Sequence, residues 1–187
     1  MEVGNLVGMS GPNHNISIGL NESRSHFGAW VTVSSPLIIG MDITNKTNLD
    51  SVWPFLSNPE AIAVNQAWDG EPGKLVWSGD QPYYDVVVKR VNSTREYHVG
   101  GNYTRVRPTV AVLVVSKDAG ELSVELPLSL FGLPVDCTWE MTYTVRDIWG
   151  RRDLGEIQVG AGGNVTWAVE KVPSHDSVFL LFSHKSG

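Results

Sequence analysis

The chain has 187 residues, of which 42% are hydrophobic and 18% are charged, and its formal net charge is -6. A chain of this length and composition can bury a core as one domain or as a small pair of domains. Its basic residues are scattered, whereas a nucleic-acid-binding surface needs a basic stripe, so we expect no nucleic-acid partner. The longest purely aliphatic run, Val110 to Val115, is far too short to cross a bilayer, and we expect no membrane partner.

The first helix and the first strand are predicted between residues 18 and 43. Apolar residues from Ile18 or Leu20 to about Val33 recur with helical spacing. Ser35-Pro36 ends this helix, because the residue before a proline avoids the helical region. The nearly continuous apolar run from Leu37 to Ile43 then predicts a parallel strand that is covered on both faces. This order of helix and buried strand is the rhythm of a βα repeat.

A second, shorter helix is predicted from Leu49 to Leu56. Thr47 or Asn48 would be its N-cap, and Pro54 should kink or shorten it because proline removes one backbone hydrogen bond. A second apolar run follows at residues 56–66 and continues the βα rhythm.

The period of the apolar residues changes to two after a linker from Asp69 to Gly73. Residues such as Trp139, Met141 and Tyr143 alternate with polar ones, so that one face of each strand is buried and the other is wet. Eight short strands at this spacing are typical of an antiparallel sandwich. The predicted strands cover residues 74–78, 84–90, 109–116, 122–126, 139–146, 154–159, 165–170 and 177–183.

Three motifs in the first seventy residues resemble the α-galactosidase family of glycoside hydrolases. They are SHFGAW at 25–30, SPLIIGMDI at 35–43 and LSNPEAIAVNQ at 56–66, and they are similar to the family's HFxLW, APLLxGxDL and LxNxEVIAVNQD. Met1-Glu2-Val3-Gly4-Asn5 is similar to the end of the family's strand-seven motif DMLEVGN. The resemblance implies an incomplete TIM barrel, an α/β barrel remnant with the last βα units, over residues 1–69. It implies an all-β antiparallel sandwich over residues 70–187.

The resemblance also implies a retaining glycoside hydrolase that removes terminal α-galactose from oligosaccharides, glycoproteins or glycolipids. A retaining enzyme needs two carboxyl groups about 5 to 5.5 Å apart, and in this family they come from barrel strands four and six. Those strands would precede Met1, so we expect no catalytic residue, cofactor or metal in this chain and no activity of the chain alone. The α-galactoside would then be a substrate of the full-length parent, for which a homodimer is also compatible with the resemblance. The same fold with another sugar, such as α-N-acetylgalactosamine or β-arabinopyranose, stays open.

Among the residues present, Asp42 is the candidate for substrate binding. It falls at the C-terminal end of the presumed barrel strand, where barrel enzymes carry their sites. The alternative is that Asp42 caps the next helix or orders a loop. His26 and His175 have no partner at metal-ligand spacing and are expected to be structural, and Ser10 has no paired base.

A secreted, non-catalytic sandwich that binds carbohydrate or another partner is the second hypothesis. Trp139 and Trp167 fall on the alternating core faces, so the expected surface platforms are other tryptophans. They are Trp53, Trp68, Trp77 and Trp149.

Six Asn-x-Ser/Thr sequons fit the acceptor pattern for N-glycosylation in surface loops of secreted proteins. They begin at Asn15, Asn21, Asn45, Asn92, Asn102 and Asn164. They predict passage through the secretory pathway, and the resemblance implies a lysosomal, vacuolar or extracellular parent. Residues 1–5 have neither the basic start nor the apolar core of a signal peptide. Together these observations predict a truncated chain.

Overall fold

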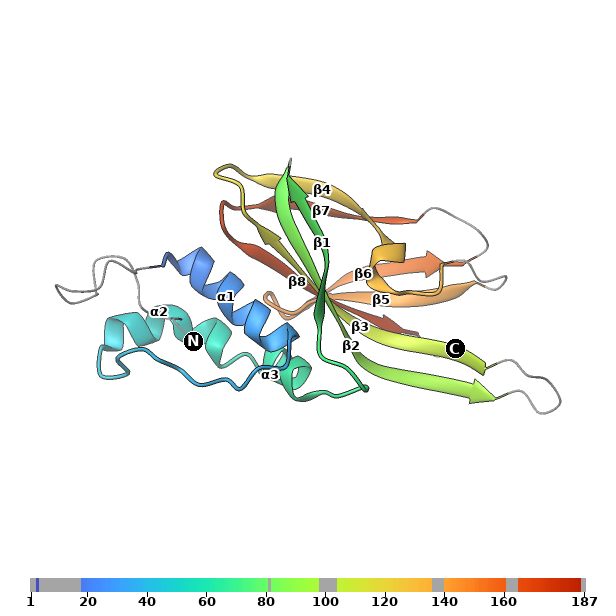
Figure 1. Cartoon of the computed structure of the whole chain (residues 1–187), viewed down its shortest axis with the longest axis horizontal. Helices are drawn as coiled ribbons and strands as arrows, with labels where there is room; N and C mark the ends of the chain where they lie inside the picture. The colour runs from blue at the N-terminus through green and yellow to red at the C-terminus, as the bar shows by residue number, and fades with distance from the viewer. Residues whose placement is uncertain are drawn as a thin grey trace.

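The computed structural model describes residues 3, 18–80, 82–97, 104–135, 140–160 and 165–185. It has three layers: helices, a six-stranded sheet and a two-stranded sheet (Figure 1). The helices are α1 (Leu20–Thr32), α2 (Lys46–Leu56) and α3 (Pro59–Gln66), with a short 3-10 helix η1 (Leu128–Phe131). The strands are β1 (Lys74–Asp80), β2 (Tyr83–Tyr97), β3 (Thr104–Ser116), β4 (Leu122–Pro127), β5 (Met141–Asp147), β6 (Arg152–Val159), β7 (Thr166–Val172) and β8 (Ser177–His184).

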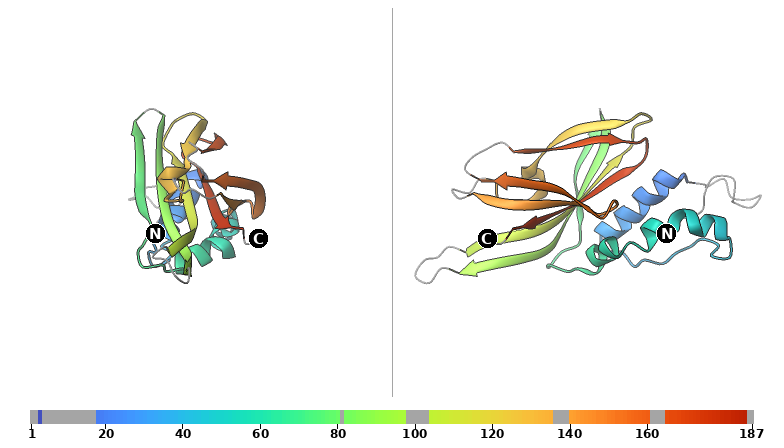
Figure 2. Two further views of the ribbon diagram at one scale, coloured as in Figure 1. Left: turned by 90° about the vertical axis from the view of Figure 1, so that its right-hand side faces the viewer. Right: turned by 180° about the vertical axis from the view of Figure 1, so that it is seen from behind.

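The eight predicted strands are all present, and every strand pair is antiparallel. The large sheet has the order β1-β2-β3-β8-β5-β6, and β4 pairs with β7 in the small sheet. Apolar residues from both sheets form one core, which confirms the predicted antiparallel sandwich. The two sheets are seen on edge in Figure 2, with the helices beyond them.

Strand β3 is buried on both faces, which explains its unbroken aliphatic run. Val110, Val112 and Val114 point into the core between the sheets. Ala111 and Leu113 belong to a second core, which the large sheet shares with the helices. Because successive side chains of a strand point to opposite faces, an alternating pattern is lost only where both faces are covered. The helices therefore form a third layer on the sandwich.

The strand predicted at 37–43 is wrong. Residues 35–40 have no regular secondary structure, and the exposed fractions of Ile38 and Ile43 are 71% and 65%. A strand is stable only when neighbouring strands satisfy its backbone N–H and C=O groups, and no described strand lies beside this segment. The apolar run therefore forms no strand: Ile38, Ile39 and Ile43 stay exposed, while Met41 is buried in the core that the helices share with the large sheet.

The helices agree with the predictions better than the strand does. Helix α1 runs from Leu20 to Thr32, as expected, and the apolar run at 56–66 contains α3. Helix α2 begins three residues earlier than predicted, because Asn45 is its N-cap rather than Thr47 or Asn48. The Asn45 side chain accepts a hydrogen bond from the backbone N–H of Asn48 at 3.2 Å. No helix among the described residues is long and apolar enough to span a membrane.

Helix α1 packs closely on the large sheet at Gly28 and forms polar contacts through Arg24 and Ser25. An added Cβ at Gly28 would lie 2.8 Å from Leu113 Cδ1 and 3.1 Å from Trp149 Cζ2, so the helix backbone approaches β3 closely. Arg24 forms a two-bond ion pair with Asp176, whose side chain is 1% exposed. Ser25 Oγ donates to the His175 carbonyl at 2.9 Å. Helix α1 is thus bound to the β7–β8 turn by hydrogen bonds and an ion pair.

Lys89 of β2 connects the large sheet to the last turn of α3. Its side chain is 1% exposed, and Nζ donates to the carbonyls of Val64 and, at 3.1 Å, Asn65. A cation at this position satisfies carbonyls that a helix C-terminus leaves without partners. Burial lowers the pKa of the Lys89 ammonium below its ordinary value, because desolvation disfavours the charged form.

We expect Gly28→Ala to destabilise the chain by roughly 1–3 kcal/mol, because its methyl group would overpack against Leu113. Urea unfolding followed by tryptophan fluorescence would measure this loss. Gly120→Ala is the matched control, since an added Cβ at Gly120 meets no atom within 4 Å. Equal stability of the two variants would contradict close packing of α1 on β3.

We expect Lys89 to make stability depend on pH in the alkaline range. Its folded-state pKa is lowered, so the unfolded chain binds more protons between that pKa and the unfolded value of about 10.4. The free energy of unfolding of the wild type, relative to Lys89→Met, should therefore rise with pH through this window and fall as pH decreases. Urea titrations of both proteins from neutral to alkaline pH would measure the difference, and a flat or falling difference would refute the assignment.

Candidate functional site

Asp42 lies in the exposed loop before α2. Its Oδ1 accepts hydrogen bonds from Thr44 Oγ1 at 2.6 Å and from the Thr44 backbone N–H at 2.9 Å. The hydroxyl bond, followed by the backbone bond, holds the pKa of the Asp42 carboxyl below its ordinary value. These contacts are an Asx-type turn. The structure therefore places Asp42 where it orders a loop, which was the alternative to substrate binding.

The two histidines that the sequence singled out lie in structural contacts. His26 stacks on Trp30, with ring centroids 6.0 Å apart. His175 adopts a left-handed backbone conformation with φ of 58° in the β7–β8 turn, and its carbonyl accepts from Ser25. Within the described ranges, no group of three or more His, Cys, Asp or Glu residues could hold a metal ion. Ser10 lies outside the described residues.

The motif at 56–66 contributes polar contacts between structural elements. Asn58 is 2% exposed; its Nδ2 donates to the Ile148 carbonyl at 2.8 Å, and its Oδ1 accepts from the backbone of Glu60 and Ala61. One side chain thus caps α3 and binds the end of β5. Asn65 Nδ2 donates to the Ser35 carbonyl at 2.9 Å, just beyond α1. The motif holds helices and sheet together.

Glu60 completes this junction by an ion pair with Arg146 of β5. The guanidinium donates from Nε at 2.8 Å and from Nη2 at 2.7 Å, so the pair is bidentate. Arg146 Nη1 also donates to Asp153 of β6 at 2.8 Å. The bonds to Glu60, and then those to Asp153, raise the pKa of Arg146. The Glu60 carboxylate is therefore committed to a structural contact.

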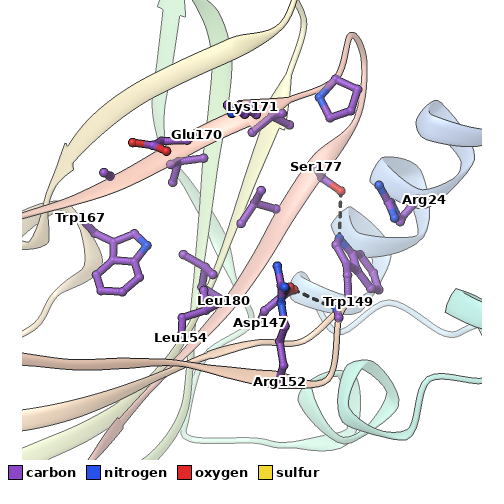
Figure 3. A pocket seen from close by; sticks show the side chains of 16 residues that line it. Arg24, Asp147, Trp149, Arg152, Leu154, Trp167, Glu170, Lys171, Ser177 and Leu180 are labelled. Atoms are coloured by element: carbon purple, nitrogen blue, oxygen red, sulfur yellow. Dashed lines mark hydrogen bonds and ion pairs between the residues drawn. The ribbon is translucent and has the colours of Figure 1, made fainter.

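A cleft of about 420 Å³ opens where β7, β8, the β5–β6 turn and α1 meet. Trp167 lies on its β7 side and Trp149 on the side of α1, with Leu154 and Leu180 between them (Figure 3). Trp149 Nε1 donates to Ser177 Oγ at 3.2 Å, which fixes the indole ring. The cleft thus has aromatic and aliphatic walls, as ligand-binding pockets commonly do.

Charged side chains of both signs line the same cleft. Glu170 and Lys171 project from β7, and Arg152 Nε donates to Asp147 Oδ2 at 3.3 Å on the opposite side. Lys171 has φ of 55°, next to a register shift between β4 and β7. Irregularities of this kind redirect side chains at a sheet rim. The arrangement can bind a ligand that has an apolar face and several polar groups.

The other predicted tryptophan platforms do not join this cleft. Trp53, Trp68 and Trp77 are exposed; Trp53 lies on α2, Trp68 just after α3 and Trp77 on β1. Trp167, which was expected in the core, is half-buried and packs edge-on against Phe182 at 5.9 Å. Trp139 lies outside the described residues. The sequence did not predict the cleft, because its walls come from four separate segments.

The sequons fall in three different settings. Asn21 lies in the first turn of α1, Asn45 caps α2, and Asn92 lies in β2. The sequon asparagines at 15, 102 and 164 lie outside the described residues.

The chain is similar to a known domain family and to curated proteins. The model of the "Alpha galactosidase C-terminal beta sandwich domain" matches residues 74–182. Probable alpha-galactosidase A of Aspergillus flavus is 27% identical over 178 residues, which are 91% of this chain and 29% of that protein. Overall, the chain spans between 12% and 29% of the length of the curated relatives it matches.

Solved structures share the fold over almost the whole chain. Alpha-galactosidase I from Mortierella vinacea superposes with a TM-score of 0.63 at 24% identity, covering 94% of this chain and 39% of that one. A β-L-arabinopyranosidase from Geobacillus stearothermophilus superposes with a TM-score of 0.66 at 19% identity, covering 91% of this chain and 32% of that one. Because the family model covers more than half of its residues, the chain belongs to the alpha-galactosidase family through its C-terminal β-sandwich domain.

Proposed function

We propose that this chain is the C-terminal part of a retaining glycoside hydrolase that removes terminal α-galactose. The observation that carries the proposal is the match of residues 74–182 to the alpha-galactosidase sandwich, together with curated relatives that are named alpha-galactosidases. The fold alone does not identify the sugar, because a protein of the same fold is named a β-L-arabinopyranosidase. The sequons support a secretory route for the parent enzyme.

In this proposal, residues 1–69 are the end of a barrel and residues 70–187 are the sandwich. The exposed Ile38, Ile39 and Ile43 of the apolar run at 37–43 support it, because a barrel strand is apolar along its length and needs a strand on each side. Trp53 and Trp68 add further exposed apolar surface to the same segment. Exposed apolar residues of both kinds are expected if residues 1–69 normally pack against the other strands and helices of a barrel.

The chain by itself should not catalyse hydrolysis. A retaining mechanism needs one carboxylate as nucleophile and one carboxyl group as acid, about 5 to 5.5 Å apart and facing the sugar. Glu60 and Asp176 are instead bound to arginines, and Asp42 is bound to Thr44. These contacts support the proposal that both catalytic aspartates belong to other strands of the parent barrel.

We expect purified residues 1–187 to leave a chromogenic α-galactoside uncleaved at the level of a heat-denatured sample. A commercial α-galactosidase, assayed in the same buffer, controls for the substrate. Reproducible hydrolysis that copurifies with the chain would contradict the absence of a catalytic pair. Sequencing the transcript upstream of the Met1 codon tests the parentage separately: an open frame for the missing barrel strands supports it, and an in-frame stop immediately upstream opposes it.

Carbohydrate binding by the sandwich is a second candidate function, and the cleft between Trp149 and Trp167 favours it. The weakly positive C–H face of a pyranose can pack on the negative face of an indole ring. Its hydroxyl groups can then bond to Arg152, Glu170 or Lys171, which line the same cleft. This function needs no catalytic pair.

We expect galactose or raffinose to shift backbone amide NMR signals of cleft residues in the wild type, and Trp167→Ala to abolish these shifts by removing one apolar wall. Trp77→Ala is the matched control, because Trp77 is exposed on β1 and does not line the cleft. A folded Trp167→Ala variant that gives the wild-type shifts, or a wild type that gives none, would reject carbohydrate binding in the cleft.

A further inference from the structure

Strands β2 and β3 continue beyond the rest of the large sheet as a long hairpin. The pairing of β1 with β2 starts at Lys74 and Val88, and the pairing of β3 with β8 starts at Val110 and Phe182. Residues 92–97 and 104–109 therefore pair only with each other among the described strands. The hairpin extends to the side away from α1 and α2 in Figure 1 and in the right view of Figure 2.

The hairpin consequently has two open edges, and only one of them contains a proline. Pro108 lies in the open part of β3, opposite Ser93. A proline at an edge removes a backbone donor and so hinders the addition of another strand. The open part of β2 at 89–97 has no proline. It carries charged residues, which hinder association, but its backbone N–H groups that point away from β3 stay available to pair with another strand.

The edge without proline carries the sequon Asn92-Ser93-Thr94. Asn92 and Thr94 are exposed, whereas Ser93 points to the linker and donates to Asp69 Oδ2 at 2.5 Å. Because side chains alternate along a strand, Asn92 and Thr94 share the solvent face. The amide and the hydroxyl that a glycosyl transfer requires are therefore both accessible.

The two other described sequons are engaged in packing. Asn21 is half-buried in α1, and its Nδ2 donates to the Ser174 carbonyl at 3.2 Å. Asn45 is half-buried and its side chain caps α2. The amide nitrogen of Asn21 is thus engaged in a contact of the fold and Asn45 is half-buried at the start of α2, whereas a glycan on Asn92 would extend into solvent.

We propose that Asn92 is the N-glycosylated site among these three and that its glycan shields the β2 edge of the hairpin from self-association. The donor is a polyprenyl-diphosphate-linked oligosaccharide. Asn92 Nδ2 forms a bond to the anomeric carbon, the bond from that carbon to the diphosphate oxygen breaks, and the amide loses one proton while the diphosphate leaves. No electron is exchanged with an oxidant or reductant. The proposal rests on the secretory route of the proposed function.

Secretion of residues 1–187 from a eukaryotic host behind an added signal sequence tests the site whether or not the natural protein enters that route. Enzymatic release of N-glycans converts the modified asparagine to aspartate, which peptide mass spectrometry locates. We expect this mark on Asn92 and none on Asn21 or Asn45. Thr94→Ala should remove one glycan mass while Asn92 stays in place, and Asn92→Gln should do the same.

Sedimentation velocity of the wild type, of its enzymatically deglycosylated form and of Thr94→Ala tests the shielding. We expect a shift to larger species when the Asn92 glycan is absent, and no shift in Asn45→Gln, which is the sequon control. If Asn21 or Asn45 carried a glycan as often as Asn92 or more often, the assignment of the glycosylation site to Asn92 would be wrong. Unchanged sedimentation of glycan-free Thr94→Ala would overturn the shielding.

Discussion

The burial of the central sheet on both faces is the constraint on which this structure depends. Leu113 and Phe179 face the helices, while Val112 and Phe182 face the small sheet. Burial of one such side chain is worth about 1.5–3 kcal/mol, and a whole domain is stable by only about 5–15 kcal/mol. A sandwich without its helices would expose several of these side chains at once. The helical segment is therefore part of the folding unit, although its composition differs from that of the sandwich.

Polar contacts determine how the helices are oriented on the large sheet. Asn58, Glu60 and Asn65 each bind a partner outside their own helix, and Lys89 binds the end of α3 from the sheet. Buried donors and acceptors are costly when they lose a partner, so these bonds allow only one arrangement of helix on sheet. The motif at 56–66 thus supplies the polar contacts between the helices and the sandwich.

The sequence predicted the local features of this fold and missed those that depend on distant partners. The strands from 74 to 184 could be found because alternation and turn residues are local signals. Residues 37–43 carry the composition of a buried strand but find no strand to pair with, so local composition was misleading there. The cap at Asn45 was missed because three residues within four positions, Asn45, Thr47 and Asn48, can each serve as an N-cap. The cleft was missed because nothing local links the four segments that form its walls.

Helix α1 makes its polar contacts with residues about as far away as the chain allows. Arg24 and Ser25 bind the turn at His175 and Asp176, roughly 150 residues later. At a synthesis rate of about 5–20 residues per second, that turn emerges roughly 8–30 s after the helix. Strands β2 and β3 emerge within this interval, and until they do Phe27 and Val31 have no sheet to cover them. Helix α1 thus gains its contacts with β3 first and its polar contacts only when the β7–β8 turn has been synthesised.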